Sequence, residues 1–312
     1  MKLFGAEVRR FLARRAVVLL LVAGFGLSLF IVGAELWNHR PVSAQTLQIA
    51  EDRADAEAQQ PYVQRDYKRC LERPRRYGGQ CENLLPQAEW FLNQQTLQPL
   101  ESIKTISLPI VVTLGFMVLL AGTSFLGAEF SSGSISNVLL FEPRRWRVWL
   151  AKMAATGTLV GAAAILTVVL GYGAITAFGM AWTDVSYTGD QWWALAYRAL
   201  RAALVVGGAT LLGAAVTAAL RSTIATVGLV LGYLLVGEAL LRAVLFEQTV
   251  RWLVSNHVSA FVDGRLKVTH YPADGPPEVV RFHLQESAIY LGVGMAVVLL
   301  LSYLVFRRRD IA

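Results

Sequence analysis

Six long apolar blocks constrain this 312-residue chain more than any other feature of its sequence. Each block is close to the length, roughly 20 residues, that a helix needs to cross a bilayer core of about 30 Å. Only 16% of the residues are charged, whereas an ordinary soluble domain has about 25%. We therefore predict an all-α polytopic membrane protein with spans at 16–33, 106–127, 152–180, 195–220, 224–246 and 288–306.

The segments between the spans complete the predicted organisation. The N-terminal 15 residues alternate apolar and basic side chains at helical spacing, which is typical of an interfacial helix; the alternative is that they form only the basic flank of span one. Outside the membrane we expect a helical subdomain after span one and a β-hairpin region before span six, with Asp263-Gly264 as the hairpin turn. The predicted segments are 1–15 (interfacial helix), 34–105 (outer helical subdomain), 128–151 (cytoplasmic segment), 181–194 (outer loop), 247–287 (outer loop with hairpin) and 307–312 (cytoplasmic tail).

The positive charge is concentrated at the termini and at the loops after spans two and four. The 13 basic and four acidic residues there give +9, whereas the rest of the chain gives −2. By the positive-inside rule, both termini are expected in the cytoplasm of a multi-pass plasma-membrane protein, most simply in a bacterial inner membrane. This distribution argues against nucleic acid as a partner, because a DNA-binding protein would need a basic face on a soluble module.

Small residues and cysteines predict two further contacts. The spacings Gly157-x-x-x-Gly161 and Gly228-x-x-x-Gly232 suit close helix packing. Cys70 and Cys81 both lie in the outer subdomain, where an oxidising compartment would favour a disulfide, with two unpaired thiols as the alternative.

The sequence has no motif for catalysis or for a metal. It lacks a phosphate-binding P-loop, a His-Glu-x-x-His zinc pair and a Gly-x-Ser-x-Gly nucleophile elbow. We therefore expect no catalytic residue, metal or cofactor in this chain. Glu238 and Arg242 are ionisable residues on the fifth predicted span, four positions apart. They either line a translocation pathway or neutralise each other, with Arg242 reaching the interface.

The segment from Gly127 to Lys152 is the most informative one. An acidic residue ends the second span, a Ser/Gly and Leu-Leu stretch leads to a proline, and an arginine and a lysine open the third span. This pattern resembles the permease subunits of type 2 ABC transporters. The matching positions are Glu129, Gly133, Leu139, Leu140, Pro143, Arg145 and Lys152.

The resemblance implies a coupling helix within 130–141 that docks on a separate ATP-binding subunit. It implies a complex of two ATPase subunits, which bind ATP and Mg, with this permease and a second one, identical or homologous. The implied coupling residues are Glu129, Phe130, Gly133, Leu139, Leu140, Phe141, Pro143 and Arg145.

The family is mostly one of exporters, and the apolar spans favour a hydrophobic or amphipathic substrate such as a drug, lipid or peptide. Three alternatives stay open. The loop after span two is an ordinary basic cytoplasmic loop, or the chain is an ATP-independent secondary transporter or channel, or it is a membrane scaffold or receptor that uses its outer subdomain.

Overall fold

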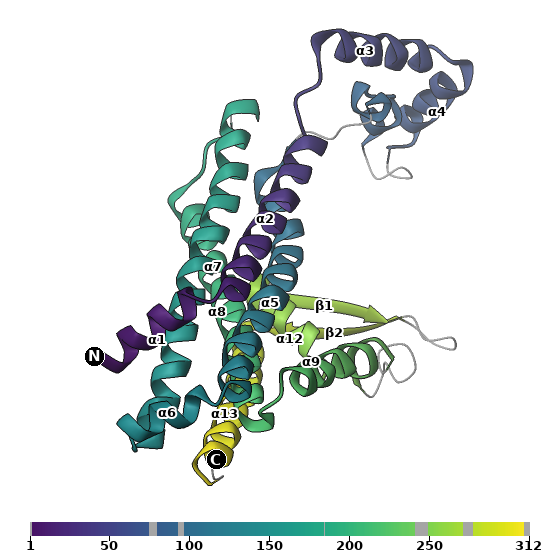
Figure 1. Cartoon of the computed structure of the whole chain (residues 1–312). Coiled ribbons are helices and arrows are strands. Elements are labelled where there is room, and N and C mark those ends of the chain that lie inside the picture. The colour runs from purple at the N-terminus through teal and green to yellow at the C-terminus, as the bar shows by residue number, and fades with distance from the viewer. Residues whose placement is uncertain are drawn as a thin grey trace. The chain divides into compact units, whose positions relative to one another are not determined.

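The computed structural model describes residues 2–74, 80–92, 97–183, 185–240, 249–270 and 277–308 (Figure 1). The chain divides into two compact units. The first comprises Met1–Val32, Ile103–Ile175 and Tyr187–Ala312, and the second comprises Gly33–Ser102 and Thr176–Ser186.

Six helices in the described part of the chain are long and apolar enough to cross a membrane, which confirms a helical multi-pass membrane protein. The fifth is an α-helix that continues as a π-helix, η4. Residues 241–246 of the predicted fifth span, Arg242 among them, lie outside the described residues. The six are α2 (Arg15–Asn38), α5 (Pro99–Ser131), α7 (Arg145–Thr183), α8 (Gly189–Leu220), α9 with η4 (Thr223–Gly232 and Tyr233–Leu240) and α13 (Leu284–Arg308).

Helices α5 and α8 approach each other closely through glycines. A Cβ atom added at Gly122 would collide with the Thr210 carbonyl, and one added at Gly213 would collide with the Leu119 carbonyl. Small residues allow such backbone contact between helices in a membrane. The sequence pointed instead to two other glycine pairs.

Those predicted pairs behave differently from each other. Gly157 packs on the Leu211 side chain, and Gly161 lies beside Gly207. Gly228 and Gly232 on α9 have open space around them, so the prediction of close packing there is wrong for the described residues. The motif fixes only the spacing along one helix, whereas packing also requires a partner opposite that face.

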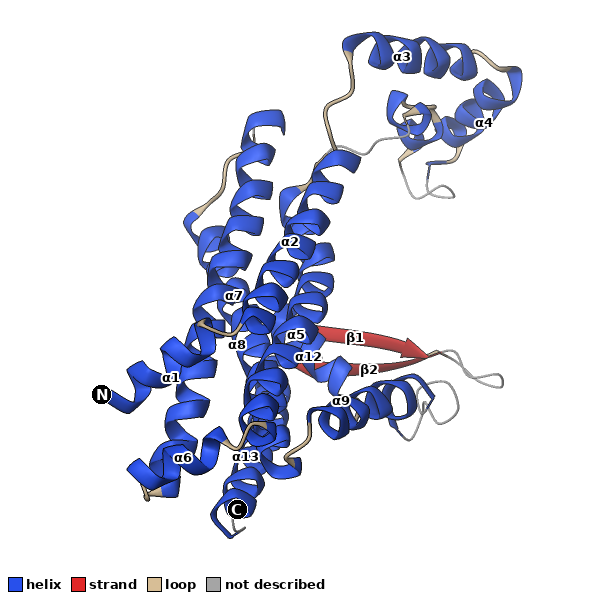
Figure 2. Cartoon of the chain, viewed as in Figure 1, coloured by secondary structure: helices blue, strands red, loops and turns tan. Residues whose placement is uncertain are grey.

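A small α/β element precedes α13, and Figure 2 shows its two strands in red. It consists of α12 (Val254–Asp263), β1 (Arg265–His270) and β2 (Glu278–His283). The strands pair antiparallel from Arg265↔His283 to His270↔Glu278. Phe282 packs with Val250 and Ala260 in the core of this element.

The prediction that Asp263-Gly264 turns the hairpin is wrong. Asp263 ends α12, and Gly264 caps that helix in the left-handed conformation, with φ 86°. Both a tight hairpin turn and a helix C-cap favour glycine at positive φ, so the dipeptide alone did not separate them. The hairpin consists of β1 and β2, so both of its strands follow Asp263-Gly264 in the sequence.

The second unit contains the predicted helices of the 34–105 segment. It has α3 (Ala44–Ala58), α4 (Pro61–Glu72) and two short 3-10 helices, η2 (Cys81–Leu84) and η3 (Ala88–Phe91). Ser43 caps α3 by accepting a hydrogen bond from the Thr46 amide at 3.2 Å. A disulfide joins Cys70 to Cys81 and connects the end of α4 to η2.

Candidate functional site

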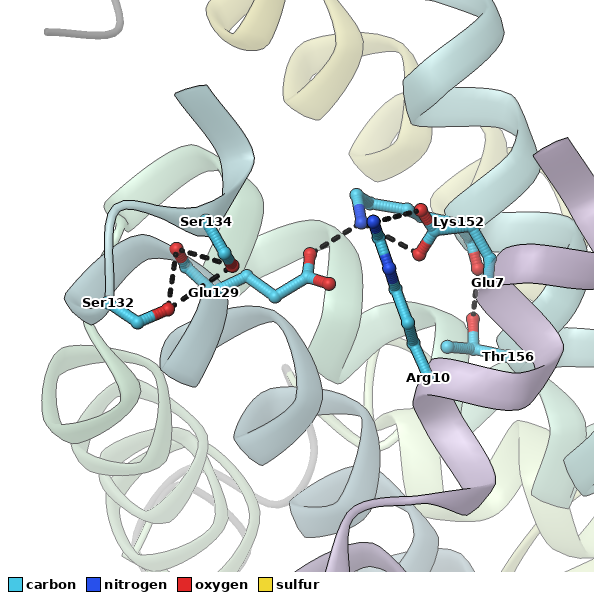
Figure 3. A network of polar contacts seen from close by, with 7 residues as sticks. All are labelled: Glu7, Arg10, Glu129, Ser132, Ser134, Lys152 and Thr156. Carbon is cyan, nitrogen blue, oxygen red and sulfur yellow. Dashed lines mark hydrogen bonds and ion pairs between the residues drawn. The ribbon is translucent and has the colours of Figure 1, made fainter. Parts of the chain in front are cut away.

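Three charged side chains meet in the interior of the first unit (Figure 3). Lys152 on α7 lies between Glu7 of α1 (Lys2–Leu12) and Glu129 near the end of α5. Lys152 Nζ is 2.8 Å from Glu7 Oε2 and 2.5 Å from Glu129 Oε2. We call these three residues the charge triad. It links α1 to α5 and α7, which lie much later in the sequence.

The charge triad is almost completely removed from solvent. The exposed fractions of the Lys152, Glu7 and Glu129 side chains are 1%, 0% and 3%. Arg10 contributes a second positive charge, with NH1 3.1 Å from Glu7 Oε1, and its side chain is 48% exposed. Two carboxylates and two cations balance, as burial of charge requires.

Aromatic rings surround this triad and fix α1 against the bundle. The Phe125 ring lies 5.5 Å from Lys152 Nζ and 5.1 Å from the Phe11 ring. Glu7 and Phe11 are one turn apart, so the same face of α1 holds both contacts. Phe4 and Leu12 stay exposed, so only part of the predicted interfacial helix is available to a membrane surface.

A sharp turn connects the triad to the next helix, α6 (Ser134–Phe141). Gly133 lies in the left-handed region, with φ 66°. The Ser132 and Ser134 hydroxyls donate to the Glu129 carbonyl at 3.5 and 3.4 Å, as Figure 3 shows. These contacts connect the start of α6 to the residue whose side chain belongs to the charge triad.

Helix α6 is buried on one side and apolar at its exposed tip. Ile135 and Val138 are buried, whereas Leu140 and Phe141 are 81% and 92% exposed. Leu140 and Phe141 thus form an exposed apolar pair outside the long apolar helices, and exposed apolar patches mark contact sites for a protein or a membrane.

The start of α7 is anchored to the end of α13. Arg145 donates to the Arg307 carbonyl at 3.1 Å, and Trp149 Nε1 donates to Ser302 Oγ at 3.3 Å. In Figure 1, α6 and the C-terminal end of α13 lie at the same end of the bundle. Arg221 extends over the Phe130 ring at 5.9 Å, so the connection between α8 and α9 reaches this end too.

The predicted coupling residues thus differ in their surroundings. Leu140, Phe141 and Pro143 are exposed, whereas Glu129 is buried in the triad and Arg145 is bonded to the end of α13. Phe130 and Leu139 are half-buried, and Gly133 forms the turn. The sequence analysis did not identify Glu7. Its signal was a single acid within a basic segment, one turn from an apolar residue.

Glu238, the predicted pathway residue, caps α12. Its carboxylate accepts hydrogen bonds from the Tyr233 hydroxyl at 2.7 Å, the Ser255 amide at 3.1 Å and the Ser255 hydroxyl at 2.5 Å. An acid at a helix N-terminus satisfies free amides and opposes the helix dipole. This contact gives Glu238 a structural role, and its pairing with Arg242 lies outside the described residues.

A second polar group lies where α12 meets α8. Arg198 is 3.1 Å from Asp263, and the Arg201 guanidinium borders Gly264. Burial raises the pKa of the Asp263 carboxyl above its ordinary value, while Arg198 and Arg201 act in the opposite direction. These contacts hold the C-terminal end of α12 on α8.

Comparison of the chain with models of known families and with curated proteins found no match.

Proposed function

We propose that this chain is the transmembrane permease subunit of an ATP-driven transporter of the type 2 ABC class, and that α6 docks on a separate ATP-binding subunit. The observation that supports the proposal most is the exposed apolar tip of α6, Leu140 and Phe141, on a helix whose other face is buried. The resemblance of residues 127–152 to that class points to the same helix.

The charge triad supplies a path from α6 into the bundle. Movement of α6 acts through the Gly133 turn on Glu129, and from Glu129 through Lys152 on α7 and on Glu7 of α1. Buried ion pairs resist separation because each charge needs its partner. We propose that α1, the end of α5 and the start of α7 therefore move together when the ATPase closes, which shifts the spans between two states.

The proposed orientation puts both termini and α6 in the cytoplasm of a plasma membrane. The charge pattern assigns Arg14, Arg145 and Arg221 to the cytoplasmic side, and all three make contacts at one end of the first unit. Arg14 lies over the Phe125 ring, Arg145 donates to the Arg307 carbonyl, and Arg221 lies over the Phe130 ring. The positive-inside rule favours this end as the cytoplasmic one.

The proposed assembly contains two ATP-binding subunits, which bind ATP and Mg, and a second permease. Large apolar residues on α9, η4 and α13, such as Leu229, Leu235, Ile289 and Leu300, remain exposed. They provide surface for lipid and for the second permease. We propose export of a hydrophobic or amphipathic substrate, because the spans are mainly apolar.

The test is purification of the chain from native membranes in mild detergent. We expect a P-loop ATPase to co-purify and to hydrolyse ATP with vanadate sensitivity. The double variant Leu140→Asp, Phe141→Asp should lose the ATPase while remaining folded, because both side chains are exposed. Leu71→Asp, an exposed leucine on α4, is the matched control and should retain it. A chain that purifies without an ATPase, or a double variant that keeps it, would contradict the proposal.

A further inference from the structure

The second unit contains a cavity of about 560 Å³ between the start of α3 and η3. This volume falls within the range of about 300 to 1,000 Å³ that is usual for small-molecule sites. The described residues that line the cavity all belong to this unit. The site therefore does not depend on how the two units are arranged.

One face of α3 forms a wall of this cavity. Thr46, Ile49, Ala50 and Arg53 follow the spacing i, i+3, i+4, i+7 and all line it. Ala50, in the middle of this wall, is small and buried. Phe91 and Leu92, at the end of η3, add apolar surface from a different part of the chain.

The charged residues described in the lining are both basic. Arg40 and Arg53 line the cavity, and none of the described residues that line it is acidic. The Arg40 guanidinium lies 4.2 Å from the centre of the Trp37 ring, a contact that orients it. The hydroxyls of Ser43 and Thr46, 2.8 Å apart, add polar groups to the same surface.

We infer that this cavity binds a small amphipathic anion, with a phosphate or carboxylate group between Arg40 and Arg53 and an apolar body against Ile49, Phe91 and Leu92. Guanidinium groups form paired, charge-assisted hydrogen bonds with such anions. Binding of this kind needs no ATPase, so the inference stands or falls separately from the proposed transport function.

The probe is 1-naphthyl phosphate, which is soluble and fluorescent and has an anionic group on an apolar ring. Its binding to the full-length chain in phosphatidylcholine nanodiscs is measured by fluorescence polarisation. We expect saturable binding, with little competition from inorganic phosphate or 1-naphthylmethylamine. Arg40→Gln and Arg53→Gln should each weaken binding at least tenfold. Arg65→Gln, an exposed arginine on α4 outside the cavity, is the matched control and should bind like the unmodified chain.

The source of the natural anion follows from a second arm. If phosphatidylglycerol in the nanodisc competes with the probe, the cavity takes a lipid headgroup; if it does not, the cavity takes a soluble amphiphile. Either result supports the inference once the arginine variants have lost binding. Three results would overturn it: no binding of the probe, equal binding of the cationic analogue, or unchanged binding by both arginine variants with their circular dichroism intact.

Discussion

Lys152 is the residue whose replacement tests the structure most directly, because it is the cation shared by two buried carboxylates. Methionine has nearly the same length and volume, so Lys152→Met removes the charge without leaving a large cavity. Glu7 would keep Arg10 as a partner, whereas Glu129 would lose its Lys152 ion pair. Breaking a buried pair in this way costs about 3–5 kcal/mol of unfolding free energy.

A second substitution separates the loss of the ion pair from general damage. In the double variant Lys152→Met, Glu129→Gln the negative charge is removed together with its partner. We expect it to recover at least about 2 kcal/mol relative to Lys152→Met alone, because replacement of both partners of a buried pair is often nearly neutral. Glu129→Gln alone should cost less than Lys152→Met, since Lys152 would retain Glu7 at 2.8 Å.

The assay is equilibrium unfolding in mixed micelles with increasing sodium dodecyl sulfate, followed by circular dichroism, on all four proteins. The four values form a double-mutant cycle whose coupling energy isolates the Glu129–Lys152 contact. A coupling energy within about 0.5 kcal/mol of zero, the range expected of independent sites, would refute the charge triad. A Lys152→Met protein as stable as the unmodified chain would refute it as well.

Three other predictions concern the backbone and pH. Gly133→Val should lower the free energy of unfolding by at least about 1–2 kcal/mol, because φ 66° is costly for a residue with a Cβ, and Gly133→Asn should lower it less in the same unfolding assay. Gly213→Ala should destabilise the chain, because the new Cβ meets the Leu119 carbonyl. Gly228→Ala, which places its Cβ in open space, is the control and should be neutral or stabilising by up to about 1 kcal/mol. Equal effects of the two substitutions on the free energy of unfolding would contradict the α5–α8 contact. Burial raises the pKa of Asp263 in the folded state above 3.8. The folded chain therefore binds this proton more tightly than the unfolded chain, and the contribution of Asp263 to stability falls as the pH rises from the unfolded pKa through the folded pKa. Asp263→Asn should remove that fall in unfolding curves measured from pH 3 to pH 7.

The number and type of the long helices could be predicted because they follow from local sequence. Roughly 20 apolar residues in a row suffice to identify a candidate span, and all six were found. The ends of the helices were less certain, since α5 begins at Pro99 and α7 at Arg145, beyond the apolar blocks. Polar residues can extend a helix past the membrane without changing the apolar pattern that identifies it.

Contacts between distant segments could not be predicted in the same way. Glu129 was noticed because of its place in the Gly127–Lys152 pattern. Its connection to Glu7 runs through the Lys152–Glu7 contact, which joins residues 145 positions apart in the sequence. The Gly228 and Gly232 pair shows the converse error, because a packing motif was present without a described helix against it. Both cases concern which face meets which neighbour, and one sequence does not contain that information.

The charge triad and the tip of α6 depart in opposite ways from the usual rule that charged side chains are exposed and apolar ones are buried. Charged side chains are buried where α1, α5 and α7 meet, and apolar side chains are exposed a few residues later at Leu140 and Phe141. The buried charges hold a specific arrangement of helices, because any other arrangement leaves a charge unpaired. The exposed pair gains its stabilisation only when a second surface covers it. In the proposed complex, a partner bound to the tip would act on α1, α5 and α7 together, because the charge triad joins these three helices.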